Sequence, residues 1–194
     1  MKIRKRGTDA GIESLTRDLL RQLGENPARE GLRNTPGRVA RAWKELTSGY
    51  ELDEKGLLNG AIFDAPDSDL VVVSDIQFFS MCEHHLLPFF GCAQVGYIPD
   101  KRIIGLSKIP RLVTAFSRRL QVQERMTSQI ADAIEEAIRP HGVAVVLEAR
   151  HLCMEMRGAR SVHAPTRTSA MRGVFRSDAR TRAEFLDLIG RPCR

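Results

Sequence analysis

The spacing of apolar residues near the start of the chain predicts a helix. Ile12, Leu15, Leu19 and Leu23 recur three or four positions apart, so they share one face of a helix. Gly24 follows the last of them, and glycine commonly ends a helix. We therefore expect a first helix that stops at Gly24.

A second amphipathic pattern comes after a polar loop. Thr35 is the expected N-cap, Pro36 occupies the first helical position, and Gly49 ends the segment. The stripe expected to be buried consists of Val39, Ala42, Trp43 and Leu46. Together the two helices predict an N-terminal helical arm over residues 1–66, attached to a main unit over residues 67–194.

From about Leu70 the pattern becomes that of β-strands. Residues 70–81 are rich in β-branched and aromatic side chains, and residues 91–99 alternate apolar with small or polar positions. Two helices should follow, over residues 108–120 and 123–138, then strands over 143–156 and 166–175 and a short helix near 181–189. This order predicts an α+β fold in which two helices separate two pairs of strands.

Composition and charge narrow the classes of protein. The 194 residues suffice for one domain with a helical appendage. A net charge of +6 raises the possibility of nucleic-acid binding, but aromatic residues make up only 6% of the chain and are not interleaved with a basic stretch. A small polyphosphate is the better expected partner. No segment resembles a signal peptide or a membrane span, so we expect a soluble cytoplasmic protein that binds neither membrane nor nucleic acid.

Cysteine and histidine cluster in two short segments. Cys82 and His85 have the spacing of a metal clip. His151 and Cys153 are two residues apart, which places them on the same face if the strand continues through them. Cys153 is the natural third ligand, and two thiolates with one imidazole suit zinc. Three ligands leave one position open, as catalytic zinc sites do.

Other cysteines and histidines have simpler interpretations. His84 or Cys92 remains possible as a fourth ligand of a closed, structural site. Otherwise Cys92 and Cys193 are expected to be small buried apolar residues. His141 and His163 are expected to be ordinary loop residues.

Basic residues near a second motif suggest an anion site. Ser107 can cap the following helix, while Lys108 and Arg111 lie three residues apart on one of its faces. Arg157 should lie near Cys153 by sharing its strand, and Arg38 on the second helix can add a further charge. Each of these alone would be an ordinary surface charge, so the prediction depends on their number.

One carboxylate is suited to recognise a guanine. Glu124 can accept hydrogen bonds from the N1–H and the 2-amino group of guanine, whereas adenine presents an acceptor at N1. Gln123 stands beside it. The alternative is that Glu124 only stabilises the first turn of a helix.

Five segments together resemble the GTP cyclohydrolase type I family. They are CEHHLLPFFG, VGYIP, GLSKIPR, QVQERMT and HLCMEMRG, and they occur in the order typical of that family. The resemblance runs from about the first helix to the last. It implies the tunnelling fold, assembled as a homodecamer of two pentameric rings with active sites between subunits.

The resemblance also assigns roles to individual residues. It implies one Zn²⁺ per subunit held by Cys82, His85 and Cys153, and proton transfer by His84 and His151. It implies that GTP is bound through its triphosphate by Arg38, Lys108, Arg111 and Arg157, through its ribose and phosphate end by Ser107, and through its guanine by Gln123 and Glu124.

The implied reaction opens the imidazole ring of GTP, releases C8 as formate and yields 7,8-dihydroneopterin triphosphate. Two other interpretations remain: a related tunnelling-fold enzyme acting on another purine or pterin, and a zinc-stabilised oligomer without catalytic activity. The pathway that uses the product, whether for folate, biopterin or a deazapurine, stays open.

Overall fold

A five-stranded sheet forms the centre of the protein. The structure is a computed structural model that describes residues 7–65, 69–162 and 164–190. The strands lie in the order β5-β2-β3-β6-β7, and all neighbours are antiparallel except β5 and β2. Their bounds are β2 Val71–Cys82, β3 Pro88–Ile98, β5 Leu120–Gln121, β6 Gly142–His151 and β7 Thr166–Gly173.

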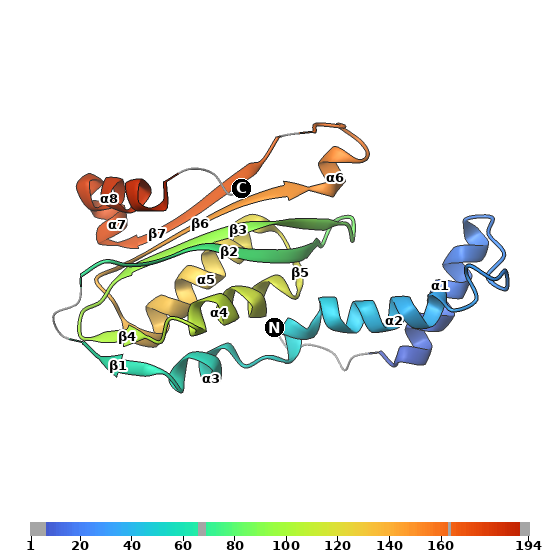
Figure 1. The fold of residues 1–194 in the computed structure, drawn as a ribbon, viewed down its shortest axis with the longest axis horizontal. Coiled ribbons are helices and arrows are strands. Elements are labelled where there is room, and N and C mark those ends of the chain that lie inside the picture. The colour runs from blue at the N-terminus through green and yellow to red at the C-terminus, as the bar shows by residue number, and fades with distance from the viewer. Residues whose placement is uncertain (1–6, 66–68, 163, 191–194) are drawn as a thin grey trace.

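One face of this sheet is covered by two helices, α4 (Lys108–Ser117) and α5 (Gln123–Ile138) (Figure 1). The end of β2 nearer the β2–β3 turn shows the expected alternation, since Ile76, Phe78 and Ser80 are buried while Gln77 and Phe79 are exposed. The helices bury Ile109, Leu112, Met126, Ile130 and Ile134 completely. This layer is the main hydrophobic core.

The opposite face carries a smaller helical cover. The short helix α7 (Val174–Ser177) leads into α8 (Ala179–Ile189), and the rings of Phe175 and Phe185 meet edge to face at 5.6 Å. Phe185 packs directly on β3 at Gly96, where an added Cβ would lie 2.7 Å from the ring. Glycine at this position therefore lets α8 approach the sheet closely.

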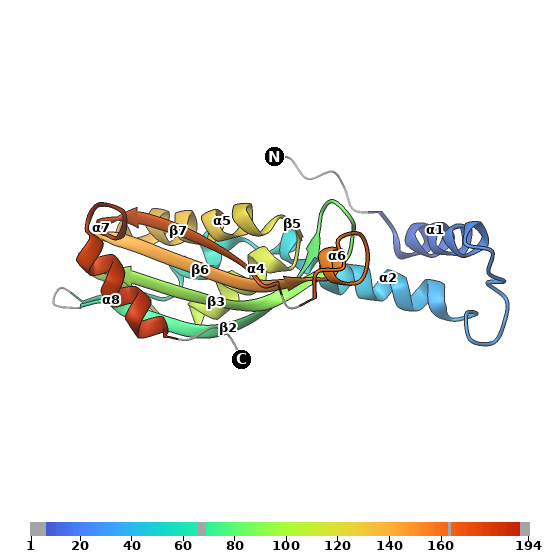
Figure 2. The ribbon, with the colours of Figure 1, turned by 90° about the horizontal axis from the view of Figure 1, so that it is seen from above.

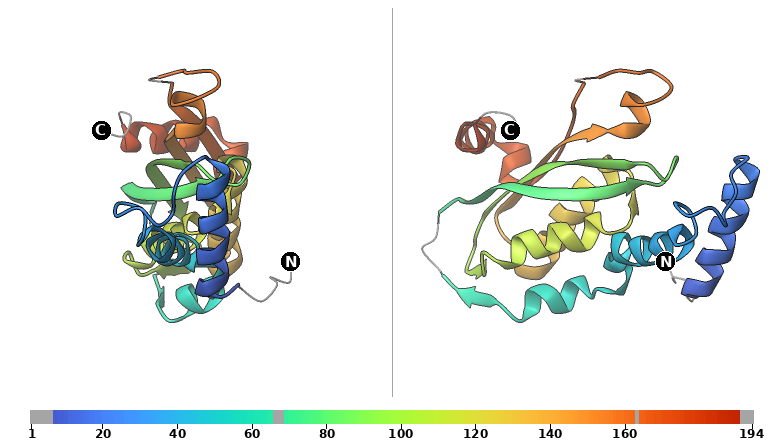
Figure 3. Two further views of the ribbon diagram at one scale, coloured as in Figure 1. Left: turned by 90° about the vertical axis from the view of Figure 1, so that its right-hand side faces the viewer. Right: turned by 45° about the vertical axis from the view of Figure 1, so that its right-hand side comes forward.

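The N-terminal helices stand out from this body. Helices α1 (Asp9–Gln22) and α2 (Thr35–Leu46) pack on each other beyond one end of the sheet (Figures 2 and 3). The following elements are η1 (Ser48–Glu51), α3 (Glu54–Asn59) and β1 (Ile62–Asp64), which pairs with β4 (Arg102–Ile104). Leu58 is 1% exposed within the main core, so α3 already packs on the body.

Most predicted elements are confirmed. Gly24 adopts the left-handed conformation just after α1, and α5 has the predicted bounds. Helix α4 ends at Ser117, earlier than predicted, because Leu120 and Gln121 leave it to pair with β2. No helix within the described residues is long and apolar enough to cross a membrane.

Two details predicted for the second helix are wrong. Thr35 is the first helical residue, and Asn34 occupies the N-cap position without a side-chain capping bond. The predicted stripe is half-buried at Val39, Trp43 and Leu46 but exposed at Ala42, while the fully buried residues of α2 are Pro36 and Ala40.

The predicted strand over 143–156 is also too long. Strand β6 ends at His151, and Leu152–Glu155 form a helical turn, α6. The last pair of the ladder joins His151 to Phe89, and β3 begins at Pro88, so β6 has no partner beyond this point. The unpaired backbone turns into a helix, in which Met156 donates to the carbonyl of Leu152.

Candidate metal centre and substrate site

The turn between β2 and β3 holds Cys82 and His85, two side chains of a group that could hold a metal ion. Cys82 is the last residue of β2, and its backbone N–H donates to the carbonyl of Leu87 across the turn. The backbone N–H of Leu86 returns to the Cys82 carbonyl, with Leu86 in the left-handed region at φ 54°. This tight turn places the Sγ of Cys82 3.9 Å from the Nδ1 of His85.

The third ligand comes from the helical turn after β6. The ligand atoms of Cys82, His85 and Cys153 all lie within 4.8 Å of one another. Ligands of a tetrahedral zinc ion are about 3.6 Å apart, so a small contraction would close the group around an ion. Within the described residues no other histidine, cysteine or carboxylate joins this group. The donors present fit zinc with an open fourth position.

Neither alternative fourth ligand belongs to the group. His84 is exposed, and its ring lies 6.3 Å from that of His85, nearly perpendicular to it. Cys92 is buried in β3, as predicted, and its sulfur is disulfide-bonded, so it cannot serve as a thiolate ligand. His141 is an exposed residue next to β6, as predicted, while Cys193 and His163 lie outside the described residues.

The two thiols of the group influence each other. Burial raises the pKa of the Cys153 thiol, and the neighbouring Cys82 raises it further. Both changes disfavour the thiolate in the metal-free protein. A bound cation reverses this balance, because it deprotonates the thiols that ligate it.

The imidazole ring of His151 is held in place by a stacking contact and by a hydrogen bond. Its imidazole stacks on Phe89 with the centroids 4.7 Å apart and the planes within 2° of parallel. Burial lowers the pKa of His151, while the nearby carboxylates Glu124 and Glu155 act in the opposite direction. The prediction that His151 and Cys153 share a strand face is wrong, because the chain turns into α6 between them. The two residues are nevertheless close in sequence at the same end of the sheet.

Gln123 fixes the orientation of this histidine. The side-chain nitrogen of Gln123 lies within hydrogen-bonding distance of three oxygens, those of Leu147, Thr166 and the Thr168 hydroxyl, at 3.0–3.2 Å. Its oxygen therefore faces the Nε2 of His151 at 2.7 Å. Because an amide oxygen only accepts, the Nε2 of His151 carries a hydrogen. Gln123 is 1% exposed, so its amide is committed to these partners.

Two further predicted residues lie at this end of the sheet. Glu124 is exposed in the first turn of α5, next to Gln123. The Nη1 of Arg157 lies 3.5 Å from the Nε2 of His85. The prediction that Arg157 shares a strand with Cys153 is wrong, because Cys153 lies in α6 and Arg157 follows that helix.

The predicted anion site lies at the other end of the sheet. Tyr97 pairs with Val71, and its hydroxyl accepts from the backbone N–H of Ile104, just before α4. From Val71 to Cys82, the 12 residues of β2 span about 36 Å at about 3.3 Å per residue. The segment that leads into Ser107, Lys108 and Arg111 therefore starts at the Val71 end of β2, away from Cys82. Ser107 occupies the N-cap position but makes no capping bond through its side chain.

Arg38 lies in the arm. It lines a hollow of about 400 Å³ between α1 and α2. The hollow is lined by Glu13, Arg17, Arg33, Asn34, Gly37, Arg38 and Arg41. Four guanidinium groups outnumber the single carboxylate, so the hollow favours an anion.

Comparison with known proteins agrees with the chemistry of this site. The family model described as GTP cyclohydrolase I matches residues 12–190. The chain belongs to the GTP cyclohydrolase I family. The predicted family, the α+β tunnelling fold and the assignment as an enzyme are thereby confirmed.

Individual members of the GTP cyclohydrolase I family are similar over most of their length. GTP cyclohydrolase 1 of Deinococcus radiodurans is 56% identical over 178 residues, which cover 92% of this chain and 82% of the relative. The enzyme of the same name from Leptospira biflexa is 56% identical, covering 92% and 97%. That of Methylococcus capsulatus is 54% identical over 180 residues, covering 93% and 97%.

A solved structure shows a weaker similarity. The crystal structure of the archaeosine synthase QueF-Like in the apo form matches with a TM-score of 0.47 and 16% identity, covering 55% of this chain and 96% of that one. A similarity at this level supports no inference.

Sequence reasoning missed the residues that support the site. Phe89, which stacks on His151, and Arg125, which binds Glu83, belong to the same motifs as the predicted residues. Neither residue was among the predicted metal ligands or substrate-binding residues. The signal that could have identified them is the need of a histidine ring, and of a turn that carries ligands, for a neighbouring residue that fixes its orientation.

Replacing Gln123 by leucine should destabilise the protein. The change removes the donor to the buried oxygens of Leu147 and Thr166, so the free energy of unfolding should fall by about 1–3 kcal/mol. The control is Gln77→Leu on the exposed side of β2, which should change it by less than about 0.5 kcal/mol. Chemical unfolding of both variants measures the difference. Equal losses would show that the buried amide contributes nothing specific.

Proposed function

We propose that this chain converts GTP to 7,8-dihydroneopterin triphosphate with release of formate, the first step of tetrahydrofolate and pterin biosynthesis. The observation that carries the proposal is the compact group of Cys82, His85 and Cys153, beside which Gln123 and Phe89 hold His151. A zinc ion would be held by these three ligands, one ion per chain. When bound, zinc lowers the pKa of a coordinated water from about 15.7 to about 7, which permits hydrolysis at neutral pH.

The two histidines that are not ligands would move protons. The Nε2–H of His151 is bound to Gln123, which fixes the ring orientation, so the other ring nitrogen, Nδ1, would supply a proton to N7 of the guanine as its imidazole ring opens. His84 is exposed on the ligand turn and would protonate the ribose ring oxygen during the later rearrangement.

Glu124 would read the guanine base. Its exposed carboxylate lies near His151 and can accept from the N1–H and the 2-amino group. The side chain of Gln123 is buried, and its amide is already hydrogen-bonded. Gln123 would therefore contribute to guanine binding indirectly, by orienting His151. The triphosphate would be bound by Arg38, Ser107, Lys108, Arg111 and Arg157.

These groups support a homo-oligomer with active sites between subunits. Helix α4, which carries Lys108 and Arg111 in its first turn, begins next to β4, away from the end of β2 that carries Cys82, and this arrangement supports a site to which a second chain contributes. A neighbouring copy would supply Lys108 and Arg111, in a decamer of two pentameric rings. The division into an arm (1–66) and a catalytic unit (67–194) belongs to the same proposal, as does a cytoplasmic location, where GTP is available.

A direct assay tests the reaction. Purified protein loaded with zinc should release formate from GTP and, after oxidation, give the fluorescence of neopterin. Cys153→Ser should abolish both signals because it removes a ligand. Met154→Leu, a substitution of similar volume in the same helical turn, is the control that should retain them. Formate production without zinc would contradict the proposed metal chemistry.

Base selection tests Glu124. Glu124→Gln replaces one acceptor oxygen by a donor, so a donor faces a donor on guanine, at a cost of about 1–3 kcal/mol. GTP binding should weaken about tenfold. ITP, which lacks the 2-amino group, should be a poor substrate of the parent protein, and the preference for GTP over ITP should shrink in the variant. Glu135→Gln, an exposed carboxylate on the same helix, is the control. An unchanged ratio of kcat/KM for the two nucleotides would exclude Glu124 from base recognition.

Mixing two inactive variants tests the shared site. Lys108→Ala and Cys153→Ser should each be inactive alone. In a symmetric assembly formed from equal amounts, roughly a quarter of sites would combine an intact Lys108 from one chain with an intact Cys153 from its neighbour. Co-expressed variants should therefore recover about that share of activity. No recovery, with mixed oligomers verified by mass spectrometry, would place the site within one chain.

A further inference from the structure

The turn that carries Cys82 and His85 is not held by packing. His84, His85 and Leu86 are all exposed. The backbone of Leu86 is in the left-handed region, which residues other than glycine rarely adopt. The three ligand atoms must nevertheless keep a fixed spacing to bind one ion. Something other than a hydrophobic core must therefore keep this turn in place.

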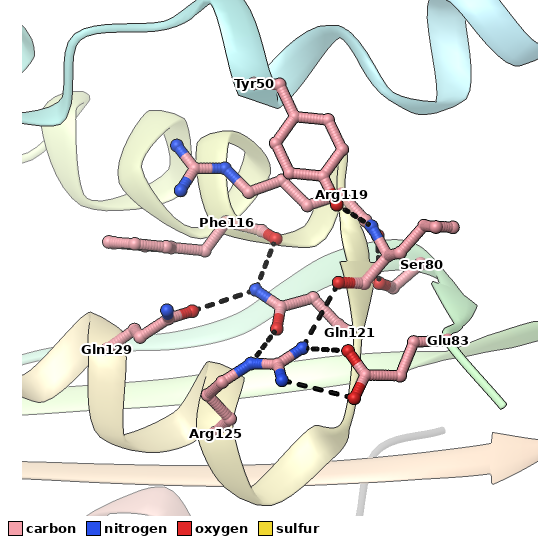
Figure 4. Close-up of polar contacts among 9 residues, drawn as sticks. Tyr50, Ser80, Glu83, Phe116, Arg119, Gln121, Arg125 and Gln129 are labelled. Carbon is pink, nitrogen blue, oxygen red and sulfur yellow. Dashed lines mark hydrogen bonds and ion pairs between the residues drawn. The ribbon is translucent and has the colours of Figure 1, made fainter. Parts of the chain in front are cut away.

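Glu83 provides the connection, because it lies within the turn and its carboxylate points to α5. Both of its oxygens are bound by the guanidinium of Arg125, with Nη1 to Oε1 at 3.2 Å and Nη2 to Oε2 (Figure 4). The Nη2 of Arg125 also lies 3.3 Å from the carbonyl of Leu120. A bidentate pair of this kind fixes the direction of the carboxylate as well as its distance.

A buried amide orients the arginine in turn. Gln121 is 1% exposed, and its side-chain nitrogen donates to the carbonyl of Phe116 and to the side-chain oxygen of Gln129, at 3.0 and 2.9 Å. These bonds turn its side-chain oxygen towards the Nε of Arg125, 3.2 Å away. The chain of contacts therefore runs from the buried core to the exposed turn without a gap.

The backbone makes a second link between the same elements. Gln121 pairs with Cys82 where β5 joins β2, and the Gln121 carbonyl accepts from the backbone N–H of Glu83 at 3.0 Å. Cys82 is thus fixed to β5 through the backbone. The turn itself is closed by the backbone bonds of Cys82 with Leu86 and Leu87, and the side chain of Glu83 anchors it to α5.

We propose that Arg125 is a positioning residue that holds the metal-ligating turn through Glu83, with Gln121 setting the direction of its guanidinium. Exposed ion pairs usually contribute little to folding stability. The effect of this pair should therefore appear in metal affinity, because the pair anchors the turn that carries two of the three ligands to α5. This inference rests on the metal centre proposed above.

The test measures zinc affinity directly. Metal-free parent protein and the variants Arg125→Gln, Arg125→Lys and Glu83→Gln are titrated with Zn²⁺ against a chromophoric chelator. Circular dichroism establishes that each variant is folded. Arg125→Gln and Glu83→Gln should each weaken zinc binding about tenfold, the usual lower limit for losing a residue that orients a ligand. Arg125→Lys should lose nearly as much, because lysine keeps the charge but not the bidentate geometry.

A double variant distinguishes this mechanism from general destabilisation. Because Arg125 and Glu83 act through one contact, Arg125→Gln combined with Glu83→Gln should bind zinc no more weakly than either single variant. The control is Arg172→Gln. It removes the ion pair between Arg172 of β7 and Asp132 of α5 and should leave zinc affinity unchanged.

The possible results separate this inference from the proposed function. Unchanged zinc affinity in both single variants, or losses that add in the double variant, would overturn the positioning role and leave the metal centre intact. A parent protein that binds no zinc would overturn the metal centre and this inference together. If Arg125→Gln does not fold, Glu83→Gln in the exposed turn decides the question alone.

Discussion

The register of the antiparallel sheet is the constraint on which the site depends. Phe89 pairs with Ser80 on one side and with His151 on the other. This register brings the last residues of β2 and of β6 to the same end of the sheet, although they are distant in sequence. A slip of one residue would turn the side chains of β6 to the opposite faces. The metal-ligating turn and the stacked histidine are close together only because this ladder is in place.

Buried amides continue this constraint into the site. Gln121 lies just before the start of α5 and Gln123 at its start. Both are 1% exposed, and the side-chain amide of each forms hydrogen bonds with the surrounding fold. Because an unpaired amide is costly in the interior, each has a single favourable orientation. Gln123 passes this orientation to His151 and Gln121 to Arg125. The polar interior thereby fixes groups that lie at the protein surface.

The length of the sheet has a different consequence. It separates the end of β2 that carries Cys82 from the end near which α4 begins, while α1 and α2 project beyond the sheet and pack mainly on each other. Leu15, Leu19 and Leu23 are 58–70% exposed along α1, next to a hollow rich in arginine. These exposed apolar and basic surfaces are the part of the chain to which the proposed assembly would assign further contacts.

The sequence by itself determined the order of the main elements, the family and the three side chains that the fold gathers into one group that could hold a metal ion. Helical and strand periodicities are local, and motif spacing such as that of Cys82 and His85 is local too, so both are readable without a structure. The short strands β1, β4 and β5 and the end of β6 were not readable, because they depend on which strand happens to lie alongside. His151 and Cys153 illustrate the difference: sequence placed them on one strand face, but β6 ends where its partner ends. The contacts of Gln123 and Arg125 were likewise decided only by the tertiary structure. A side-chain amide or guanidinium can bond many partners, and the fold alone selects which of them lie within reach.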